Sequence, residues 1–535
     1  MKKIKVLSMA ALVAGGMALS SCGDDFLSPS PTEKAATGTA ATEGTINLAL
    51  TSAYQILLFD TYANNNYNGV LLMSDLRSDD IYKGGSDAGD QGQLYSLSQF
   101  NLSPNEGFGL WNIYYSGLAR TNNAIIACGD ASGVDADNLK RLNAEAHLLR
   151  AYYLHLLWKF YGNVVFFSEP IEPVNGTYVA PQYTADDIYK QIIADLEVAC
   201  EEGALPMKTN SGSSMGRVNR AMALMLKARV VMYQKDSSRY AEITKDMAEI
   251  IKSGEYSLVQ AADHKEDGLD WMWLNEGEFN GESIFETNQA PTGKTWSSGW
   301  QGFGTNLPAF ISPADLAPTS DEKADIAAFQ FRADGWGFGP VRKSAYDMYE
   351  DGDLRRDASI ADWGTAAEDG IVKYVKRFQD TGYFQKKYAA RKGYAELPGD
   401  QALNFCNNLR LFRYAETLLN YAELVNMFGQ SEVDGVSAQS CFDQIRDRAF
   451  GDTSHRIALN ADNIKLERRR EFFGEGMRFW DLVRWGDAAK VLTENDPDHS
   501  SVRTFTEDKK YMPIPQTDID NTKGSAYELK QNPGY

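Results

Sequence analysis

The sequence predicts a mainly α-helical protein in which two helix-rich stretches flank an irregular lobe of loops and short strands. Residues 142–160 are apolar on most sides at helical spacing, as in a helix buried between neighbours. Residues 256–400 instead hold sixteen glycines and six of the ten tryptophans. Glycine-rich loops lie at surfaces and expose the large side chains that they carry. We therefore expect residues 45–255 and 401–535 to form a helical scaffold, residues 256–400 to carry a ligand surface, and residues 45–535 to fold as one compact unit.

Residues 1–21 have the layout of a bacterial export signal. Three lysines precede an apolar run at residues 6–19, which is too short to span a bilayer. The motif LSSC, which ends at Cys22, resembles a lipobox, in which small side chains flank the scissile bond and the cysteine accepts a lipid. We expect residues 1–21 to be removed, Cys22 to be lipidated and residues 22–44 to form a tether. The alternative is an ordinary secreted protein in which Cys22 is incidental.

The first scaffold stretch contains several helices with clear boundaries. The helix at residues 142–160 ends before Gly162, and Thr184 is placed to cap the start of the next helix. Residues 219–234 and 239–253 then predict a helix–turn–helix of about the length of a tetratricopeptide (TPR) repeat.

The second scaffold stretch repeats this plan. Residues 409–428 place apolar side chains at steps of three and four, Gly429 stops the helix, and residues 436–449 supply a partner helix. The sequence shows no strict repeat of about 34 residues. We expect TPR-like hairpins, and a plain helical array without TPR geometry is the alternative.

The charge and the motifs of the chain exclude several classes of function. A formal net charge of −20 repels phosphate backbones, so nucleic acid is not an expected ligand. The five histidines show no metal-ligand spacing, and no GxSxG, Walker or dinucleotide motif occurs. No motif indicates an enzyme, although counting residues does not exclude a glycosidase-like carboxylate pair; the family resemblance described below implies a binding protein.

Acidic residues in one loop could hold calcium. Asp263, Glu266, Asp267 and Asp270 lie close together in the sequence, and calcium is bound by several oxygen ligands. The segment lacks the EF-hand pattern, so we prefer a solvated acidic loop and expect no cofactor.

The aromatic residues of the central lobe are the best candidates for ligand contact. Trp296, Trp300 and Phe303 lie in the segment KTWSSGWQGFG, and Trp336 lies in DGWGFGP. Flat apolar faces stack against sugar rings, while polar groups at the edges fix the orientation of a ligand. We predict that these four side chains contact a ligand, and the family resemblance described below implies that this ligand is a glycan.

Motifs spread along the chain carry a resemblance to a known family. They are AEAHLLRAY at 144–152, FRYAE at 412–416, ERRREF at 467–472, RFWDLVRWG at 478–486 and QNPGY at 531–535. In this order, behind a lipobox, they resemble the SusD/RagB family of nutrient-binding lipoproteins of the Bacteroidetes outer membrane.

The resemblance implies a SusD-like, TPR-like α/α superhelix with a ligand-binding lobe. It implies a lipid-anchored protein that faces the exterior of the cell, captures an oligosaccharide or polysaccharide, and passes it to a SusC-like TonB-dependent transporter. Family sites also use an N-terminal loop, so Arg77, Asp80 and Tyr82 are expected to supply edge contacts. A peptide-binding member of the family, or a scaffold that docks the transporter without its own ligand site, remains an alternative.

The charged residues of these motifs have a structural interpretation. The arginines at 468–470 lie in an acidic protein and are expected to bind internal carboxylates or helix C-termini rather than a ligand. Asp481 is spaced to pair with Arg478 and with Arg484, and Trp480 is spaced to contact Arg484. We predict that all of them belong to the scaffold.

Overall fold

The computed structural model describes residues 40–59, 62–63, 66–67, 69–292, 294–296, 303–324, 331, 335–395 and 400–535, with the backbone alone for 62–63 and 66–67. The predicted export signal and Cys22 lie outside these residues. Within the described ranges, no helix combines the length and the apolar character that crossing a membrane requires.

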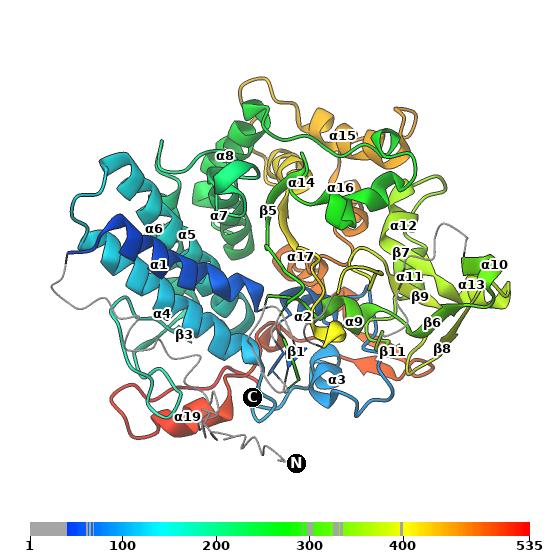
Figure 1. Cartoon of the computed structure of the whole chain (residues 1–535), viewed down its shortest axis with the longest axis horizontal. Helices are drawn as coiled ribbons and strands as arrows, with labels where there is room; N and C mark the ends of the chain where they lie inside the picture. The colour runs from blue at the N-terminus through cyan, green and yellow to red at the C-terminus, as the bar shows by residue number, and fades with distance from the viewer. Residues whose placement is uncertain are drawn as a thin grey trace, which may run out of the picture.

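The scaffold is one array of helices that joins the two ends of the chain. Consecutive helices from α4 to α8 pack on one another (Figure 1). Helix α8 also packs on α14, which contacts α15 and α16. The long helices of the scaffold have the following bounds: α1 (Glu43–Gln55), α4 (Gly109–Gly129), α5 (Ala136–Tyr161), α6 (Ala185–Ala199), α7 (Arg220–Gln234), α8 (Tyr240–Ser253), α14 (Tyr414–Asn426), α15 (Ala438–Phe450) and α16 (Ala461–Glu471). The predicted α-helical scaffold is confirmed.

Local sequence signals account for where these helices begin and end. The side chain of Thr184 accepts a hydrogen bond from the backbone N–H of Asp187, and Asn219 caps α7 in the same way. Gly486, with φ +81°, ends α17 (Arg478–Trp485) in the left-handed conformation.

One predicted helix begins later than its periodicity indicates. Residues 410–413 form strand β10 (Arg410–Arg413), which pairs antiparallel with β5 (Ser283–Glu286), and α14 starts only at Tyr414. The main-chain groups of this segment bond to a strand distant in sequence, which overrides the local helical pattern. The chain therefore leaves the scaffold for the lobe along β5 and returns beside it along β10.

Short elements make up the lobe, as predicted, and others connect the long helices of the scaffold. The two-stranded antiparallel sheets besides β5–β10 are β1 (Tyr62–Ala63) with β2 (Asn66–Tyr67), β3 (Val164–Val165) with β4 (Gln182–Tyr183), β6 (Ala314–Pro318) with β8 (Val372–Val375), β7 (Ile360–Asp362) with β9 (Tyr383–Gln385), and β11 (Glu494–Asp496) with β12 (Ser501–Arg503). The short α-helices are α2 (Val70–Asp75), α3 (Gly92–Ser98), α9 (Leu307–Ile311), α10 (Asp321–Ala324), α11 (Lys343–Tyr346), α12 (Leu354–Ser359), α13 (Trp363–Glu368), α18 (Ala488–Val491) and α19 (Gln516–Thr522). The 3-10 helices are η2 (Ile56–Leu58), η3 (Gly212–Ser214), η4 (Ser237–Arg239), η5 (Ala261–Asp263), η6 (Gly268–Trp273), η7 (Asn275–Gly277), η8 (Gln401–Leu403) and η9 (Glu507–Lys510).

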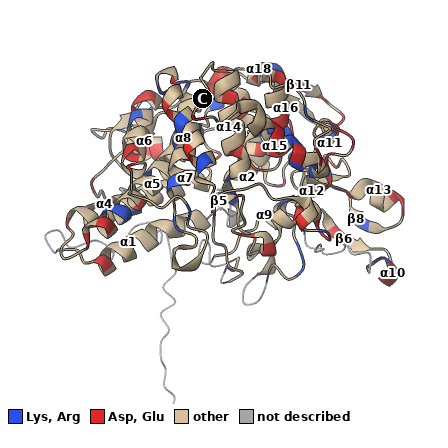
Figure 2. Cartoon of the chain, turned by 90° about the horizontal axis from the view of Figure 1, so that it is seen from above, with Lys and Arg blue, Asp and Glu red and all other residues tan. Residues whose placement is uncertain are grey.

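Acidic and basic residues are interspersed along the helices (Figure 2), and some of them are buried where the lobe meets the scaffold. We call Glu282, Arg413, Arg448, Glu471 and Glu475 the buried ion cluster. Arg413 of β10 pairs with Glu282 beside β5 and, at 2.7 Å, with Glu475. Arg448 of α15 pairs with Glu471 of α16 at 2.5 Å. The ion pairs of this cluster thus join strands of the lobe to helices of the scaffold.

The charges of this cluster hold one another in the ionised state. Burial alone would raise the pKa of Glu471, but the guanidinium groups of Arg448 and Arg413 outweigh burial and lower it well below the usual value. The stabilisation from Glu471 is therefore complete at neutral pH and is lost as the pH falls through the lowered pKa.

Replacing the central cation tests how much the cluster contributes. Arg413→Met leaves buried carboxylates without their partner, so the free energy of unfolding in urea should fall by about 3–5 kcal/mol. The control Lys190→Met removes a lysine whose side chain is 73% exposed and paired with Asp187, and it should cost less than about 1 kcal/mol. Equal effects of the two variants would contradict a structural role for the cluster.

Candidate ligand-binding site

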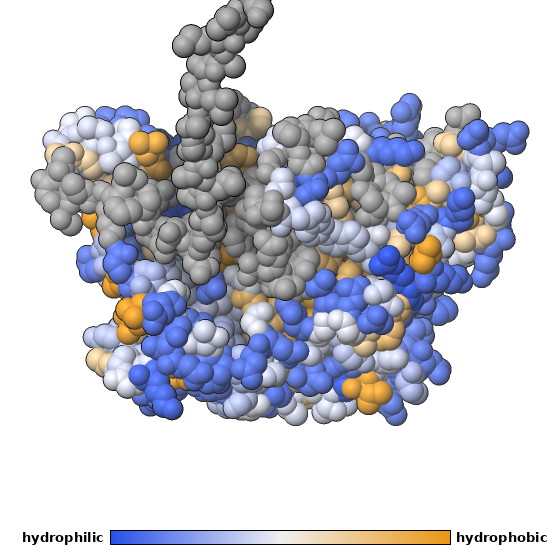
Figure 3. Space-filling model, turned by 60° about the horizontal axis from the view of Figure 1, so that its bottom comes forward, coloured by the Kyte–Doolittle hydropathy of each residue, from blue (hydrophilic) through white to orange (hydrophobic). Residues whose placement is uncertain are grey.

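Two tryptophans that are forty positions apart in the sequence lie together on the lobe. The ring centroids of Trp296 and Trp336 are 5.8 Å apart with 33° between the ring planes, and we call these two residues the indole pair. Trp296 is 45% exposed, whereas Trp336 is half-buried. The face of the molecule shown in Figure 3 is predominantly hydrophilic, with separate apolar patches. Trp296 is thus a large apolar side chain that reaches solvent beside a second indole.

Trp336 is held rigidly by α9. Its backbone N–H donates to the carbonyl of Ala309 at 2.7 Å, and its ring meets the Phe310 ring edge to face at 4.8 Å. The ring also packs on a small apolar cluster that includes Phe405. Gly337 follows with φ +71°, a conformation that favours glycine.

Trp296 is held through its main chain instead. Its backbone N–H donates to the Asp400 carboxylate at 2.8 Å. Lys294, two residues before Trp296, donates its backbone N–H to Asn404 Oδ1 at 3.0 Å. In return, Asn404 Nδ2 donates to the Lys294 carbonyl at 2.8 Å. The backbone at Trp296 is thus fixed while the indole reaches solvent.

Two further predicted stacking residues have different outcomes. Phe303 is 41% exposed, and its backbone is hydrogen-bonded to Ala290 and Thr292. Trp300 lies outside the described residues. Trp296, Phe303 and Trp336 therefore remain the described candidates for stacking.

A cation and a carboxylate lie next to the indole pair, and sequence reasoning missed both. Arg377 Nη1 donates to the Trp336 carbonyl at 3.1 Å, and its aliphatic stem lies against Gly337. Asp400 contacts the backbone of Trp296 as described above. No local signal relates these residues to the tryptophans, because they are about 40 and 100 positions away in the chain.

The predicted edge-contact residues are in the interior. Arg77 and Asp80 are each only 1% exposed, and Tyr82 is 7% exposed. Arg77 donates to the carbonyls of residues 509 and 510, Asp80 pairs with Arg469 at 2.7 Å, and the Tyr82 hydroxyl donates to Asp496 at 2.6 Å. Their burial leaves no surface for the ligand contacts expected of them, and they stabilise the scaffold instead.

The calcium alternative is not supported by the geometry of the acidic loop. Asp270 pairs with Arg391 at 2.9 Å and with Lys386 at 3.3 Å. Asp263 is exposed and Asp267 is half-exposed. Within the described ranges, no group of three or more His, Cys, Asp or Glu side chains is placed to hold a metal ion.

The motif residues of the C-terminal stretch do belong to the scaffold. Arg468 pairs with Asp481 at 2.9 Å, and Asp481 pairs with Arg484 at 2.8 Å, as predicted. Arg478 instead pairs with Asp79 at 2.8 Å, and the Trp480 ring lies under Lys159 at 4.4 Å rather than under Arg484.

A helical array that presents an exposed indole from a loop-rich lobe is the architecture of a ligand-binding protein. Comparison with known families identifies which one. Residues 338–535 match the family model described as "SusD family", and residues 25–232 match the model described as "Starch-binding associating with outer membrane". The chain belongs to the SusD/RagB family.

Solved structures similar to this chain are surface proteins of the same family. "Surface glycan-binding protein A from Bacteroides fluxus" is 64% identical, with a TM-score of 0.85, and the match covers 92% of this chain and 100% of that one. Surface glycan-binding protein A from Bacteroides thetaiotaomicron, solved with laminarihexaose, is 36% identical, with a TM-score of 0.80 and coverage of 92% and 99%. The SusD-like protein P38 of Formosa agariphila is 25% identical over 79% of this chain and 80% of its own length.

The hydrogen bonds of Asn404 yield a test of how the site is held. Asn404→Ala removes two hydrogen bonds to the Lys294 backbone, while the one from the Asp400 N–H to the Lys294 carbonyl remains, and the loss should cost about 1–3 kcal/mol. Hydrogen exchange of the amides at 294–296 should become faster, as measured by mass spectrometry. The exposed Asn426→Ala is the matched control, and unchanged exchange in Asn404→Ala would show that other contacts hold this segment.

Proposed function

We propose that this protein is a cell-surface lipoprotein that binds glycan at the indole pair and delivers it to a SusC-like TonB-dependent outer-membrane transporter. In this proposal Cys22 carries the lipid anchor and the folded chain faces the exterior of the cell. The protein binds its ligand without transforming it.

The observation that carries the proposal is the exposed indole of Trp296 beside the ring of Trp336. A sugar ring presents C–H groups on its faces, which stack on aromatic rings, and hydroxyl groups at its rim. The Asp400 and Arg377 side chains flank the pair and supply polar groups of both charges. An apolar face with few polar groups at its margin is suited to an uncharged oligosaccharide.

The relatives support laminarin-type glucan as the ligand class. The protein that is 36% identical was solved with laminarihexaose, and another neighbour, 29% identical with a TM-score of 0.78, is titled "Laminarin binding SusD-like protein". No observation in the described residues favours the peptide-binding alternative.

Titration of the mature chain with laminarihexaose tests the proposal. Trp296→Ala and Trp336→Ala should each weaken binding by about tenfold, or about 1.4 kcal/mol, because each removes a stacking face. Isothermal titration calorimetry measures the affinity, and circular dichroism checks that the helices remain.

The control for this titration is Tyr527→Ala, which removes an aromatic side chain that is 46% exposed outside the lobe. This variant should bind like the parent. If the parent binds laminarihexaose and both tryptophan variants retain its affinity, the ligand site is elsewhere. If the parent binds an oligopeptide and no glucan, the peptide alternative is correct.

The anchor is tested in cells. Cys22→Ala should abolish incorporation of radiolabelled palmitate and release the protein from the outer-membrane fraction, because no other lipid attachment site is proposed. Surface orientation is measured by protease treatment of intact cells, which should degrade the parent protein. Unchanged palmitate labelling of Cys22→Ala would contradict lipidation at this residue.

A further inference from the structure

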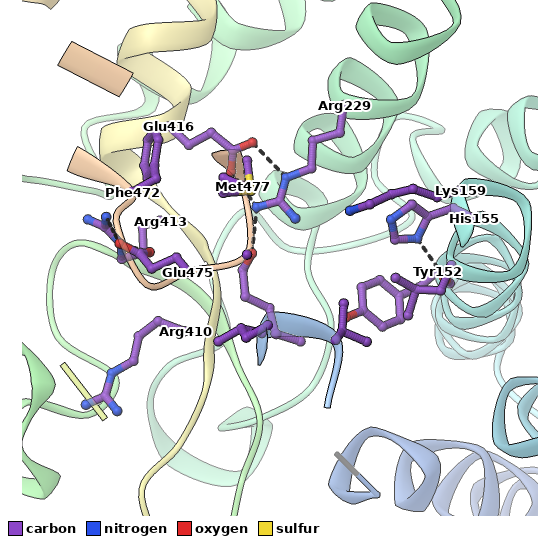
Figure 4. A pocket seen from close by; sticks show the side chains of 15 residues that line it. Tyr152, His155, Lys159, Arg229, Arg410, Arg413, Glu416, Phe472, Glu475 and Met477 are labelled. Carbon is purple, nitrogen blue, oxygen red and sulfur yellow. Dashed lines mark hydrogen bonds and ion pairs between the residues drawn. The ribbon is translucent and has the colours of Figure 1, made fainter. Parts of the chain in front are cut away.

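A cavity in the scaffold lies where five helices meet, away from the indole pair. It has a volume of about 40 Å³ and is lined by side chains of α5, α7, α14, α16 and α17, including Lys159, Tyr233, Asn420 and Trp480. A second cavity of about 40 Å³ shares His155, Lys159, Arg229, Glu416 and Met477 with it (Figure 4). One water needs about 10–15 Å³. Each space therefore accommodates a small ion and excludes a sugar ring.

Three of the polar groups that line the first cavity are hydrogen-bond donors without a partner in the described part of the chain. Trp158 Nε1, Tyr233 Oη and Asn420 Nδ2 are buried, and none has a hydrogen-bond partner among the described residues. The orientation of the Asn420 amide is set by its oxygen, which accepts from Arg468 at 2.8 Å. An indole N–H and an amide NH₂ only donate. These groups call for an acceptor inside the cavity, because a buried donor without a partner is costly.

The charge at the cavity is positive. Lys159 Nζ lies 4.4 Å from the Trp480 ring centroid, and no carboxylate of the described chain lies within ion-pair distance of it. The nearby carboxylates are engaged by guanidinium groups: Glu416 by Arg229 at 2.5 Å, and Asp481 by Arg468 at 2.9 Å. In Figure 4, Lys159 extends from α5 toward Arg229 and Glu416.

A second cation stands close to this one. The Arg77 guanidinium lies 5.4 Å from the Trp480 ring centroid, and its buried Nη1 has no hydrogen-bond partner in the described part of the chain. Burial, and then the charge of Arg229, lower the pKa of Lys159 to about 7. Burial keeps His155 neutral by lowering its pKa well below the usual value. An anion in the cavity would offset the excess of positive charge and raise the pKa of Lys159.

We propose that this cavity binds one small monovalent anion of the size of chloride, held by the Lys159 ammonium and by donors of Trp158, Tyr233 and Asn420. The ligands come from α5, α7 and α14, with the Trp480 ring of α17 forming one wall. The anion therefore joins helices of the N-terminal stretch to helices of the C-terminal stretch. This site is independent of the glycan site proposed above.

Thermal unfolding of the full mature chain in chloride and in gluconate at equal ionic strength tests the site. Gluconate is too large for 40 Å³. A ligand that binds only the folded state raises the unfolding midpoint with its concentration. The unfolding midpoint should increase more with sodium chloride than with the same concentration of sodium gluconate. This difference should be present both in the parent and in the exposed-lysine control Lys190→Met. Lys159→Met should abolish this chloride-specific rise, and Tyr233→Phe should reduce it.

The response should also depend on pH. The chloride-specific rise should be larger at pH 6 than at pH 8.5, because the Lys159 ammonium is charged only below its pKa. The groups that surround this ammonium are His155 of α5, Arg229 and Tyr233 of α7, Glu416 of α14, Arg468 of α16, Asp481 and Arg484 of α17, and Arg77.

Crystals soaked in sodium bromide provide a direct readout that does not depend on any variant. An anomalous peak inside the cavity is the expected result, and it decides the case if Lys159→Met does not fold. Equal midpoints in chloride and gluconate, or an ordered water only in the bromide-soaked cavity, would overturn the proposal.

Discussion

The pairing of buried guanidinium and carboxylate groups is the interaction on which the rest of this structure depends. The lobe has little apolar core of its own, since two of its clusters consist of four buried residues each. Instead, the lobe is held on the helices by the ion pairs of Arg413 with Glu282 and Glu471. Burying a charge is costly unless a well-placed partner offsets the loss of hydration, so this arrangement demands accurate positioning of β5, β10, α15 and α16. The loops that carry the indole pair extend from this fixed base.

The helical part of the fold could be predicted from the sequence because its signals are local. Apolar spacing located α5, α7 and α8, and capping residues such as Thr184 and Asn219 marked where helices begin. The same reasoning was wrong at residues 410–413, where pairing with β5 decides the conformation. It also gave Arg478 the wrong partner, because Asp79 approaches from a loop about 400 positions away.

The candidate site could be predicted only in part, for a related reason. Glycine-rich surroundings correctly indicated that Trp296 reaches solvent. They did not indicate that Trp336 lies beside it, since that proximity arises from α9 and from the hydrogen bonds of Asn404. Arg77, Asp80 and Tyr82 were expected at the surface, but carbonyl groups at 509–510, Arg469 and Asp496 bind them in the interior. Burial of polar residues depends on distant partners that no sequence window contains.

The neighbouring course of β5 and β10 has an evolutionary consequence. The chain departs from the scaffold and re-enters it at adjacent points, so the intervening 120 or so residues form an insertion whose ends already meet. Segments with adjacent ends can be lengthened, shortened or exchanged at small cost to the host fold. Recombination at these two strands would exchange the whole lobe in a single step and leave the packing of the helical body unchanged.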